Sequence, residues 1–274
     1  MVEGIVLGII QGITEWLPIS SEAVVILVKV NFFGNGESLK ELIGFALFLH
    51  LGTFLAAAWY LRDDVVALIK MLFKPSRIFA DGETERILRF LILATFISRI
   101  IGFFLLEVFL PSVEGQVASS TKVITGGVGV LLLGTAFLQW QARLSAKRKR
   151  VSFKTAQDLQ NRDSVLLGVV QGFSALPGFS RSGLTISALL LRNYSDMTAL
   201  RVSFLMSLPI VLGGNILLNV KEGFVLEAAM VFGFLFAFLF GILTIHILFR
   251  IARKVNFAYF VLFFGVLTIA SVFL

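Results

Sequence analysis

Cysteine is absent from the 274-residue chain, and charged residues make up only 15% of it. The first absence excludes a disulfide framework, a thiolate nucleophile and a thiolate-bound metal. The second excludes an ordinary soluble domain, in which about 25% of residues are charged. The start of the chain also lacks the basic residues of a secretory signal, and its apolar run holds Gln11, Glu15 and Pro18. We therefore expect this run to belong to the mature fold.

Hydrophobic residues account for 57% of the sequence and include 29 phenylalanines. This composition indicates an all-α polytopic membrane protein with a single integral membrane domain over residues 1–274. A membrane span needs about 20 mainly apolar residues. Six runs have this character, namely 43–61, 88–109, 123–141, 202–219, 228–249 and 255–274. Two further apolar runs, 4–30 and 164–191, each contain a polar break, and we expect both to be re-entrant helix hairpins.

The basic residues indicate how these runs are oriented. The net charge of +7 does not indicate nucleic acid binding, because Lys and Arg lie in loops between the apolar runs. There they mark the cytoplasmic face of a membrane protein. If each broken run returns to the membrane face from which it entered, most of the 24 basic residues lie on one side of the membrane. If the second broken run crossed the membrane instead, the basic residues would be distributed more evenly between the two faces.

Three spans after each hairpin invert the second half relative to the first. We therefore predict an inverted-topology repeat in the cell membrane, with both termini outside and the basic loops cytoplasmic. The first repeat covers 1–141 and the second covers 163–274, and a cytoplasmic basic linker at 142–162 joins them. The two hairpin tips should then meet near the midplane of the membrane.

The two breaks resemble one another at an offset of 160 residues. Each has glycine, glutamine, glycine and a hydroxyl residue in register, followed by a proline: Gly8, Gln11, Gly12, Thr14 and Pro18 in the first, and Gly168, Gln171, Gly172, Ser174 and Pro177 in the second. Broken hydrophobic segments at corresponding places in two halves are the best sequence indication of a membrane-embedded binding site.

The residues after each proline suit an anionic ligand. The returning helices begin near these prolines, and helix N-termini present free N–H groups that favour phosphate or carboxylate. Arg181 offers a planar fork of donors that matches phosphate oxygens. Gly183 would let the backbone approach an anion closely. The hydroxyls beside these positions, Ser20, Ser180 and Ser182, are further candidates for substrate binding.

Two carboxylates and one hydroxyl are candidates for chemistry. Glu15 could bind a divalent cation, activate a hydroxyl or water, or form a structural ion pair with Arg181. Ser21 could be a nucleophile activated by a base or metal, and it could also cap its helix. Glu22 could be a second metal ligand or could only favour the helix dipole.

Two further polar residues lie inside predicted spans. His50 could transfer protons, although a lone histidine is also common as a core residue. Arg99 lies about 16 Å into its span by helix rise. It could pair with Glu15 or Glu22, or contact the substrate.

Residues 15–21, Glu-Trp-Leu-Pro-Ile-Ser-Ser, and residues 177–183, Pro-Gly-Phe-Ser-Arg-Ser-Gly, resemble the two signature motifs of the undecaprenyl pyrophosphate phosphatase family of the bacitracin-resistance type. Residues 49–53 also resemble that family, and the similarity covers essentially the whole chain. The resemblance implies a metal-dependent hydrolase that removes the terminal phosphate of a polyprenyl pyrophosphate and regenerates the carrier lipid. It also implies roles for individual residues: Ser21 as nucleophile, Glu15 as a catalytic or metal-binding carboxylate, and Arg181, Ser180 and Ser182 as pyrophosphate ligands.

The chain departs from the family pattern at two places. The family usually has glutamate where Gln11 stands, and its expected catalytic histidine is replaced by Val24. Gln11 can hydrogen-bond a phosphate but cannot act as a base. Three interpretations stay open: Glu22 and His50 take over the missing roles, a divergent subgroup uses altered chemistry, or activity is lost.

The mechanism that we expect follows phosphoryl-transfer logic. A divalent cation, Mg²⁺ or Ca²⁺, bridges the phosphates to Glu15 and Glu22, and Ser21 attacks the terminal phosphorus while Arg181 stabilises charge. His50 or a carboxylate then activates water, although direct attack by water with Ser21 as a ligand also stays open.

The rival functions are a transporter or flippase for an anionic lipid carrier and a catalytically inactive binder. The expected partners are the polyprenyl pyrophosphate and the bilayer, without nucleic acid. A homodimer is compatible with the sequence, which leaves the oligomeric state open.

Overall fold

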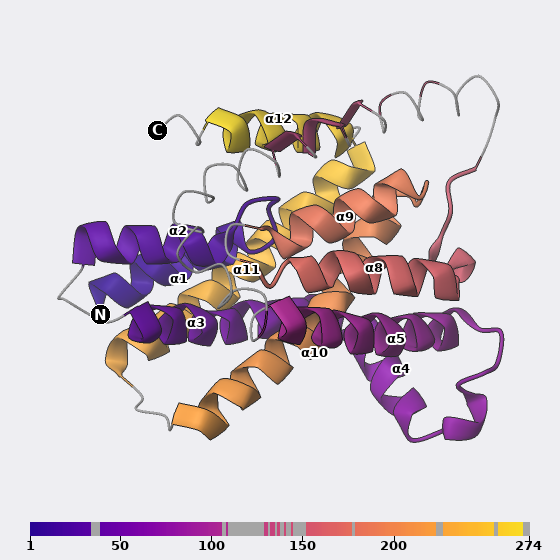
Figure 1. Ribbon diagram of the computed structural model, residues 1–274, viewed down its shortest axis with the longest axis horizontal. Coiled ribbons are helices and arrows are strands. Elements are labelled where there is room, and N and C mark those ends of the chain that lie inside the picture. The colour runs from indigo at the N-terminus through magenta and orange to yellow at the C-terminus, as the bar shows by residue number, and fades with distance from the viewer. Residues whose placement is uncertain are drawn as a thin grey trace.

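The computed structural model describes residues 1–33, 39–105, 152–176, 179–222, 227–254 and 257–270, with scattered positions between 108 and 144. Within these ranges the regular secondary structure is helical, apart from one isolated bridge between Lys154 and Tyr194. The α-helices are α1 (Val2–Thr14), α2 (Ser21–Val28), α3 (Leu39–Tyr60), α4 (Arg62–Leu72), α5 (Glu83–Phe104), α8 (Asn161–Phe173), α9 (Arg181–Leu191), α10 (Asp196–Glu222), α11 (Ala228–Lys254) and α12 (Phe257–Ala270) (Figure 1). Short turns of other helix types are η1 (Lys29–Phe33), η2 (Pro75–Arg77) and η4 (Ala156–Asp158). The all-α prediction is confirmed.

Three of these helices, α5, α10 and α11, are long and apolar enough to cross a membrane. The pair formed by α3 and α4 passes the same test together, but it bends by 89° at its break. The predicted spans 43–61, 88–109, 202–219 and 228–249 therefore coincide with α3, α5, α10 and α11. The span 123–141 lies largely outside the described residues, and the span 255–274 is described only over α12. These helices support a multi-pass membrane protein.

Helix α4 differs from the prediction, which assigned its basic residues to a loop. Val65 and Leu68 on this helix pack against the main hydrophobic core, so one side of a charged segment is apolar at helical spacing. Asp63 and Asp64 lie in the first turn and Lys70 lies in the last, where each charge favours the helix dipole. The charged residues that we predicted to lie in a loop thus stabilise the two ends of a helix.

The two broken runs each form a short helical hairpin. Helices α1 and α8 have 13 residues each, which gives about 20 Å of rise, less than the ~30 Å hydrocarbon layer. An acid–base pair joins the open end of each hairpin. Lys29 pairs with Glu3 in the first. In the second, Arg192 Nε lies 2.8 Å from Asp163 Oδ1. Glu3 and Asp163 are equivalent positions at the 160-residue offset, so both hairpins are closed in the same way.

The Asp163 pair makes stability depend on acid pH. Burial raises the pKa of the Asp163 carboxyl, but hydrogen bonds from Tyr194 and Arg192 outweigh it and hold the pKa below its usual range. A folded-state pKa below the unfolded value adds stability that is present at neutral pH and is lost as the pH falls below about 4. We expect Asp163→Asn to lower the melting temperature in detergent at pH 7 and to flatten this acid dependence. Asp81→Asn is the control, because the Asp81 side chain is 88% exposed. Equal pH profiles for both variants and wild type would contradict the assignment.

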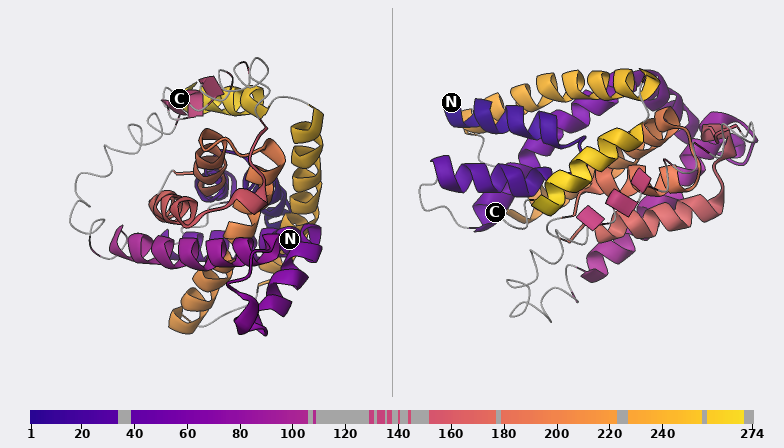
Figure 2. Two further views of the ribbon diagram at one scale, coloured as in Figure 1. Left: turned by 90° about the vertical axis from the view of Figure 1, so that its right-hand side faces the viewer. Right: turned by 90° about the horizontal axis from the view of Figure 1, so that it is seen from above.

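Each hairpin packs on a long helix of the other half of the chain. Helix α1 lies along α11 (Figure 2, right), and α8 lies along α5. Small residues permit both approaches. A Cβ added at Gly8 would overlap the Gly233 backbone, and a Cβ added at Gly168 would lie 2.8 Å from the Ala94 oxygen. The first leg of each hairpin is thereby held by the opposite half.

These contacts predict that small residues are required where the hairpins dock. Gly168→Ala places a methyl group against the α5 backbone, so we expect a lower melting temperature in detergent. Gly214→Ala is the matched control, because an added Cβ there meets nothing within 4 Å. Because Gly214→Ala removes a glycine from a helix interior without a clash, it should stabilise the fold by about 0.5–1 kcal/mol. If Gly168→Ala were as stable as Gly214→Ala, the close packing of α8 on α5 would be refuted.

Candidate active site between the hairpin tips

The tips of the two hairpins are in contact. The hydroxyls of Ser180 and Ser182 donate hydrogen bonds to the Leu17 carbonyl oxygen at 3.1 and 2.8 Å. A Cβ added at Gly183 would lie 3.0 Å from Cα and Cβ of Pro18. The start of α9 is therefore seated on the turn that follows α1, as the duplicated breaks predicted.

The two returning helices begin in the same way. Ser20 and Ser180 are N-caps with extended backbone. The Ser20 hydroxyl accepts from the Ala23 N–H at 3.4 Å, and the Ser180 hydroxyl accepts from the Gly183 N–H at 3.1 Å. Since caps satisfy the otherwise unpaired first N–H groups of a helix, the next residues, Ser21 and Arg181, are placed at two equivalent helix starts.

Glu15 is the centre of the site, and it is buried. Its Oε2 accepts from Ser21 Oγ at 2.7 Å and from Gln11 Nε2 at 2.9 Å. His50 Nε2 lies 3.1 Å from the same oxygen. The other oxygen, Oε1, pairs with Arg181. Three groups of the first half and one of the second thus meet at one carboxylate, which brings together every residue that we predicted to be catalytic.

The contacts of His50 place it where it can share a proton with Glu15. Its Nδ1 lies 2.7 Å from the Ala46 carbonyl oxygen, and its Nε2 faces the carboxylate. A neutral imidazole has only one N–H, yet both ring nitrogens face acceptor oxygens. Both contacts are hydrogen bonds when the His50–Glu15 pair holds one additional proton, either as an imidazolium or as a carboxylic acid. Such a pair can accept and return a proton during a reaction.

Three buried polar atoms beside Glu15 have no hydrogen-bond partner among the described residues. They are Gln11 Oε1, Trp16 Nε1 and Arg181 Nη1. Buried polar atoms in native proteins are normally paired, so such a group indicates a ligand or water. Two of the three are donors, and the Arg181 guanidinium lies 5.9 Å from the centre of the Trp16 ring. Arg181 Nη1 suits a phosphate oxygen, whereas Trp16 Nε1 lies beside α11, 3.6 Å from a Cβ position at Gly241. Trp16 had no predicted role, because the direction of its indole N–H gives no signal in the sequence.

The family model for the bacitracin resistance protein BacA matches residues 4–270. The chain belongs to the BacA family. It is 41% identical to a protein of Methanococcoides burtonii over 99% of this chain and 98% of the relative, and that protein is named undecaprenyl-diphosphatase. Proteins with the same name from Haloarcula marismortui and Methanothrix thermoacetophila are 35% and 32% identical. Those matches cover 92% and 98% of this chain and 90% and 95% of the relatives.

Other predicted site residues of this BacA-family chain lie elsewhere. The hydroxyls of Ser180 and Ser182 are engaged with Leu17 and with each other, so in this conformation they join the tips. Arg99 is exposed on α5, and its Nη1 lies 2.6 Å from a Cβ position at Gly213 of α10. Within the described part of the chain it forms no ion pair with Glu15 or Glu22. Substrate binding stays a prediction for the six residues proposed for it, namely Gln11, Ser20, Ser180, Ser182, Gly183 and Arg99. Pro177 lies outside the described residues.

The carboxylates of this BacA-family site differ in their suitability for a metal. Among the described residues no group of three His, Asp or Glu side chains is arranged to hold an ion. Four donors already surround Glu15, so its lone pairs are engaged. Glu22 is half-buried, lies within electrostatic range of His50, and has no hydrogen bond to any described residue. Mg²⁺ is commonly held by one or two carboxylates, water and substrate phosphates, and Glu22 fits that kind of site.

Proposed function

We propose that this chain hydrolyses a polyprenyl pyrophosphate of the undecaprenyl type to the monophosphate carrier lipid and inorganic phosphate. The observation that carries the proposal is the Ser21 hydroxyl, bonded to Glu15 at 2.7 Å beside the unpaired Nη1 of Arg181. A nucleophile, a base and a phosphate-binding cation are thereby within one site. Membership of the BacA family and the names of the relatives support the same reaction.

The first step is proposed to be attack by Ser21 on the terminal phosphorus. The Ser21 Oγ–P bond forms, the bridging P–O bond breaks, and polyprenyl monophosphate leaves. The proton of Ser21 passes to Glu15, which already accepts its hydrogen bond. Arg181 and the helix N-termini stabilise the charge that spreads over the equatorial oxygens.

The second step is proposed to be hydrolysis of the phosphoseryl group. Water attacks the phosphorus, the Ser21 Oγ–P bond breaks, and the His50–Glu15 pair takes the water proton. The pair returns one proton to Ser21 and gives the other to the departing inorganic phosphate, so that the site regains its starting protonation. A divalent cation, Mg²⁺ or Ca²⁺, when bound, would neutralise charge on the diphosphate, and Glu22 is the residue that we propose holds it. Glu15 stays a second candidate ligand.

The same geometry supports the first of the three interpretations of the departures from the family pattern. Gln11 donates to Glu15 and so holds the carboxylate that remains. His50 supplies an imidazole at the carboxylate, a role that Val24 cannot perform. We propose that His50 replaces the missing histidine and that Glu22 supplies the missing carboxylate.

We further propose six transmembrane helices and two re-entrant hairpins, related as an inverted repeat. The first leg of each hairpin packs on the second span of the other half, α1 on α11 and α8 on α5. This reciprocal packing supports the arrangement, because equivalent hairpins contact equivalent spans. The acid–base pairs at the two hairpin openings support it also.

The proposed orientation can be measured with reporters. A reporter inserted at residue 148 should be cytoplasmic and one at residue 115 should be external, because basic residues accumulate on the cytoplasmic face. Alkaline phosphatase and green fluorescent protein fusions at the two sites give opposite signals. The reverse pattern would overturn the orientation, although it would leave the site geometry intact.

Phosphate release by the purified chain tests the proposed reaction. We expect equal amounts of polyprenyl monophosphate and inorganic phosphate from undecaprenyl pyrophosphate with Mg²⁺ or Ca²⁺, and loss of release with a chelator. A short-chain pyrophosphate measures how much the lipid tail contributes. Retained substrate binding without release under any divalent metal would contradict the proposal and favour a transporter, flippase or inactive binder.

A further inference from the structure

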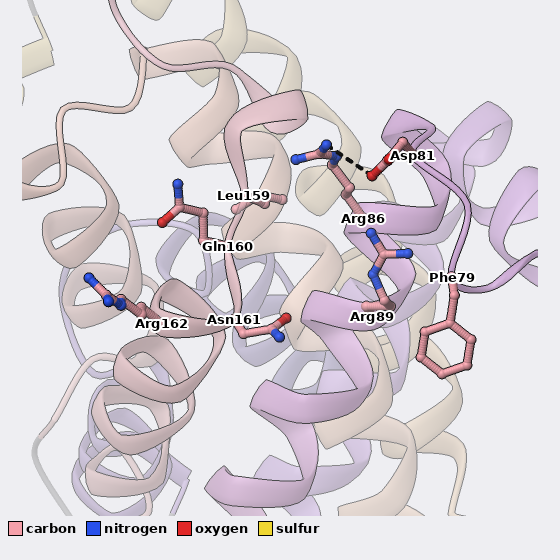
Figure 3. A pocket seen from close by; sticks show the side chains of 8 residues that line it. All are labelled: Phe79, Asp81, Arg86, Arg89, Leu159, Gln160, Asn161 and Arg162. Atoms are coloured by element: carbon pink, nitrogen blue, oxygen red, sulfur yellow. Dashed lines mark hydrogen bonds and ion pairs between the residues drawn. The ribbon is translucent and has the colours of Figure 1, made fainter.

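A shallow surface cavity of about 530 Å³ lies where α5 and α8 begin (Figure 3). It shares no residue with the site around Glu15. Three arginines and two amide side chains dominate its lining, together with one carboxylate and two apolar residues: Arg86, Arg89, Arg162, Gln160, Asn161, Asp81, Phe79 and Leu159. A cavity with this lining offers many hydrogen-bond donors to an anion.

The arginines are only partly engaged with the protein. Arg86 Nη2 lies 3.2 Å from Asp81 Oδ1, and Arg89 Nη1 donates to the carbonyl oxygens of Ile78 and Ala80. Arg162 makes no hydrogen bond to any described residue. Each guanidinium has five N–H donors, so most of them are not used by the described protein.

Three of the nearby acidic residues are engaged by other partners, whereas the carboxylate of Glu85 lies in the first turn of α5, over Gly82. Asp163 is engaged by Arg192 and Tyr194, and Glu83 by Arg201. Asp158 accepts hydrogen bonds from Thr155. The carboxylate that lines the cavity itself is Asp81, which pairs with Arg86.

Two helix N-termini add to the positive field. Gly168 of α8 faces Ala94 of α5, and Gly172 faces Ser98 and Ile101 further along, so the two helices run in the same direction. Their N-termini therefore open at the same end, beside the cavity. The positive ends of both helix dipoles favour an anion at this place.

The cavity lies where the apolar part of α5 begins, which is the level of lipid headgroups in a membrane protein. Phe79 at its rim is 84% exposed, and Leu159 at its base is buried. A cationic cavity with an apolar rim at this level suits a phosphate that carries acyl chains. We propose that this cavity binds a phosphate group, supplied by an anionic phospholipid headgroup or by free inorganic phosphate.

The test uses the full-length protein and a matched pair of double variants. Arg86→Gln with Arg162→Gln removes two charges from the cavity and leaves Arg89 to hold its loop. Arg250→Gln with Arg253→Gln removes two exposed charges at the end of α11. Retention of dioleoyl phosphatidylglycerol, with phosphatidylcholine as the neutral comparison, is measured by native mass spectrometry. Stabilisation by inorganic phosphate is measured by thermal unfolding.

We expect wild type and the α11 variant to retain phosphatidylglycerol. The cavity variant should bind it at least about tenfold more weakly, which is the effect of removing one charge-assisted hydrogen bond. If inorganic phosphate alone stabilises wild type and the cavity variant loses that effect, the source is free phosphate. Equal behaviour of wild type and cavity variant with both probes would overturn the proposal. Arg162→Gln alone keeps the test informative if the double variant does not fold, because that side chain makes no hydrogen bond to the described protein.

Discussion

Replacing Arg181 with alanine will reduce phosphate release from undecaprenyl pyrophosphate by roughly 10²–10³-fold or more, the loss typical of removing a charge-stabilising donor from a transition state. Arg181 is the group from the second half that reaches Glu15, and its Nη1 has no hydrogen-bond partner among the described residues. The alanine variant loses the phosphate donor and leaves the buried carboxylate without its cation.

Arg181→Lys separates charge from shape. Lysine keeps the charge but presents a single ammonium, which cannot serve Glu15 and a phosphate with the geometry of a planar fork. We expect an intermediate loss that lies mainly in kcat. Arg250→Ala, exposed at the end of α11, is the control and should retain wild-type turnover. If Arg181→Ala released phosphate within tenfold of wild type at an unchanged melting temperature, Arg181 would have no role in the chemistry.

The second large effect is expected at Ser21. Ser21→Ala should lose at least about 10³-fold in turnover, as enzymes do when they lose a nucleophile. Wild type stopped during turnover should carry a phosphate on Ser21, which peptide mass spectrometry detects. The alanine variant should carry none.

Ser20→Ala is the matched control, since the neighbouring hydroxyl caps α2 and makes no hydrogen bond to Glu15. It should lose about 1 kcal/mol of stability and stay within tenfold of wild-type activity. Full turnover by Ser21→Ala would exclude Ser21 as nucleophile and leave direct attack by water. A larger effect at Ser20 than at Ser21 would exchange their assigned roles.

Much of the helical framework could be predicted because a bilayer imposes a length on apolar segments. Helices α3, α5, α10 and α11 lie on runs that composition alone identifies. Helix α4 could not be predicted in the same way. Its charges follow a bilayer-length run and resemble a loop, and only the packing of Val65 and Leu68 on the core reveals its buried side.

The meeting of Glu15 and Arg181 could be predicted because both stand at corresponding breaks of a duplicated pattern. The partners of Ser180 and Ser182 could not, since they bond the Leu17 carbonyl, and a backbone oxygen has no sequence signal. Arg99 illustrates the same limit. Its depth in a span is readable from the sequence, but its position beside Gly213 depends on how α5 and α10 face one another.

The central claim is that one site is assembled from both halves where the hairpin tips touch. Because the chain has no cysteine, two introduced cysteines can report that contact. Pro18→Cys with Gly183→Cys joins positions whose Cβ atoms lie 3.0 Å apart, close to the ~3.8 Å of a disulfide. Ile13→Cys with Phe173→Cys, on the exposed sides of α1 and α8, is the control pair.

After oxidation, cleavage at a protease site inserted between residues 142 and 150 separates the two halves unless a disulfide joins them. We predict that the halves stay linked in the Pro18–Gly183 pair and separate in the Ile13–Phe173 pair. Separation of the halves in the Pro18–Gly183 pair under conditions that oxidise accessible thiols fully would contradict the account.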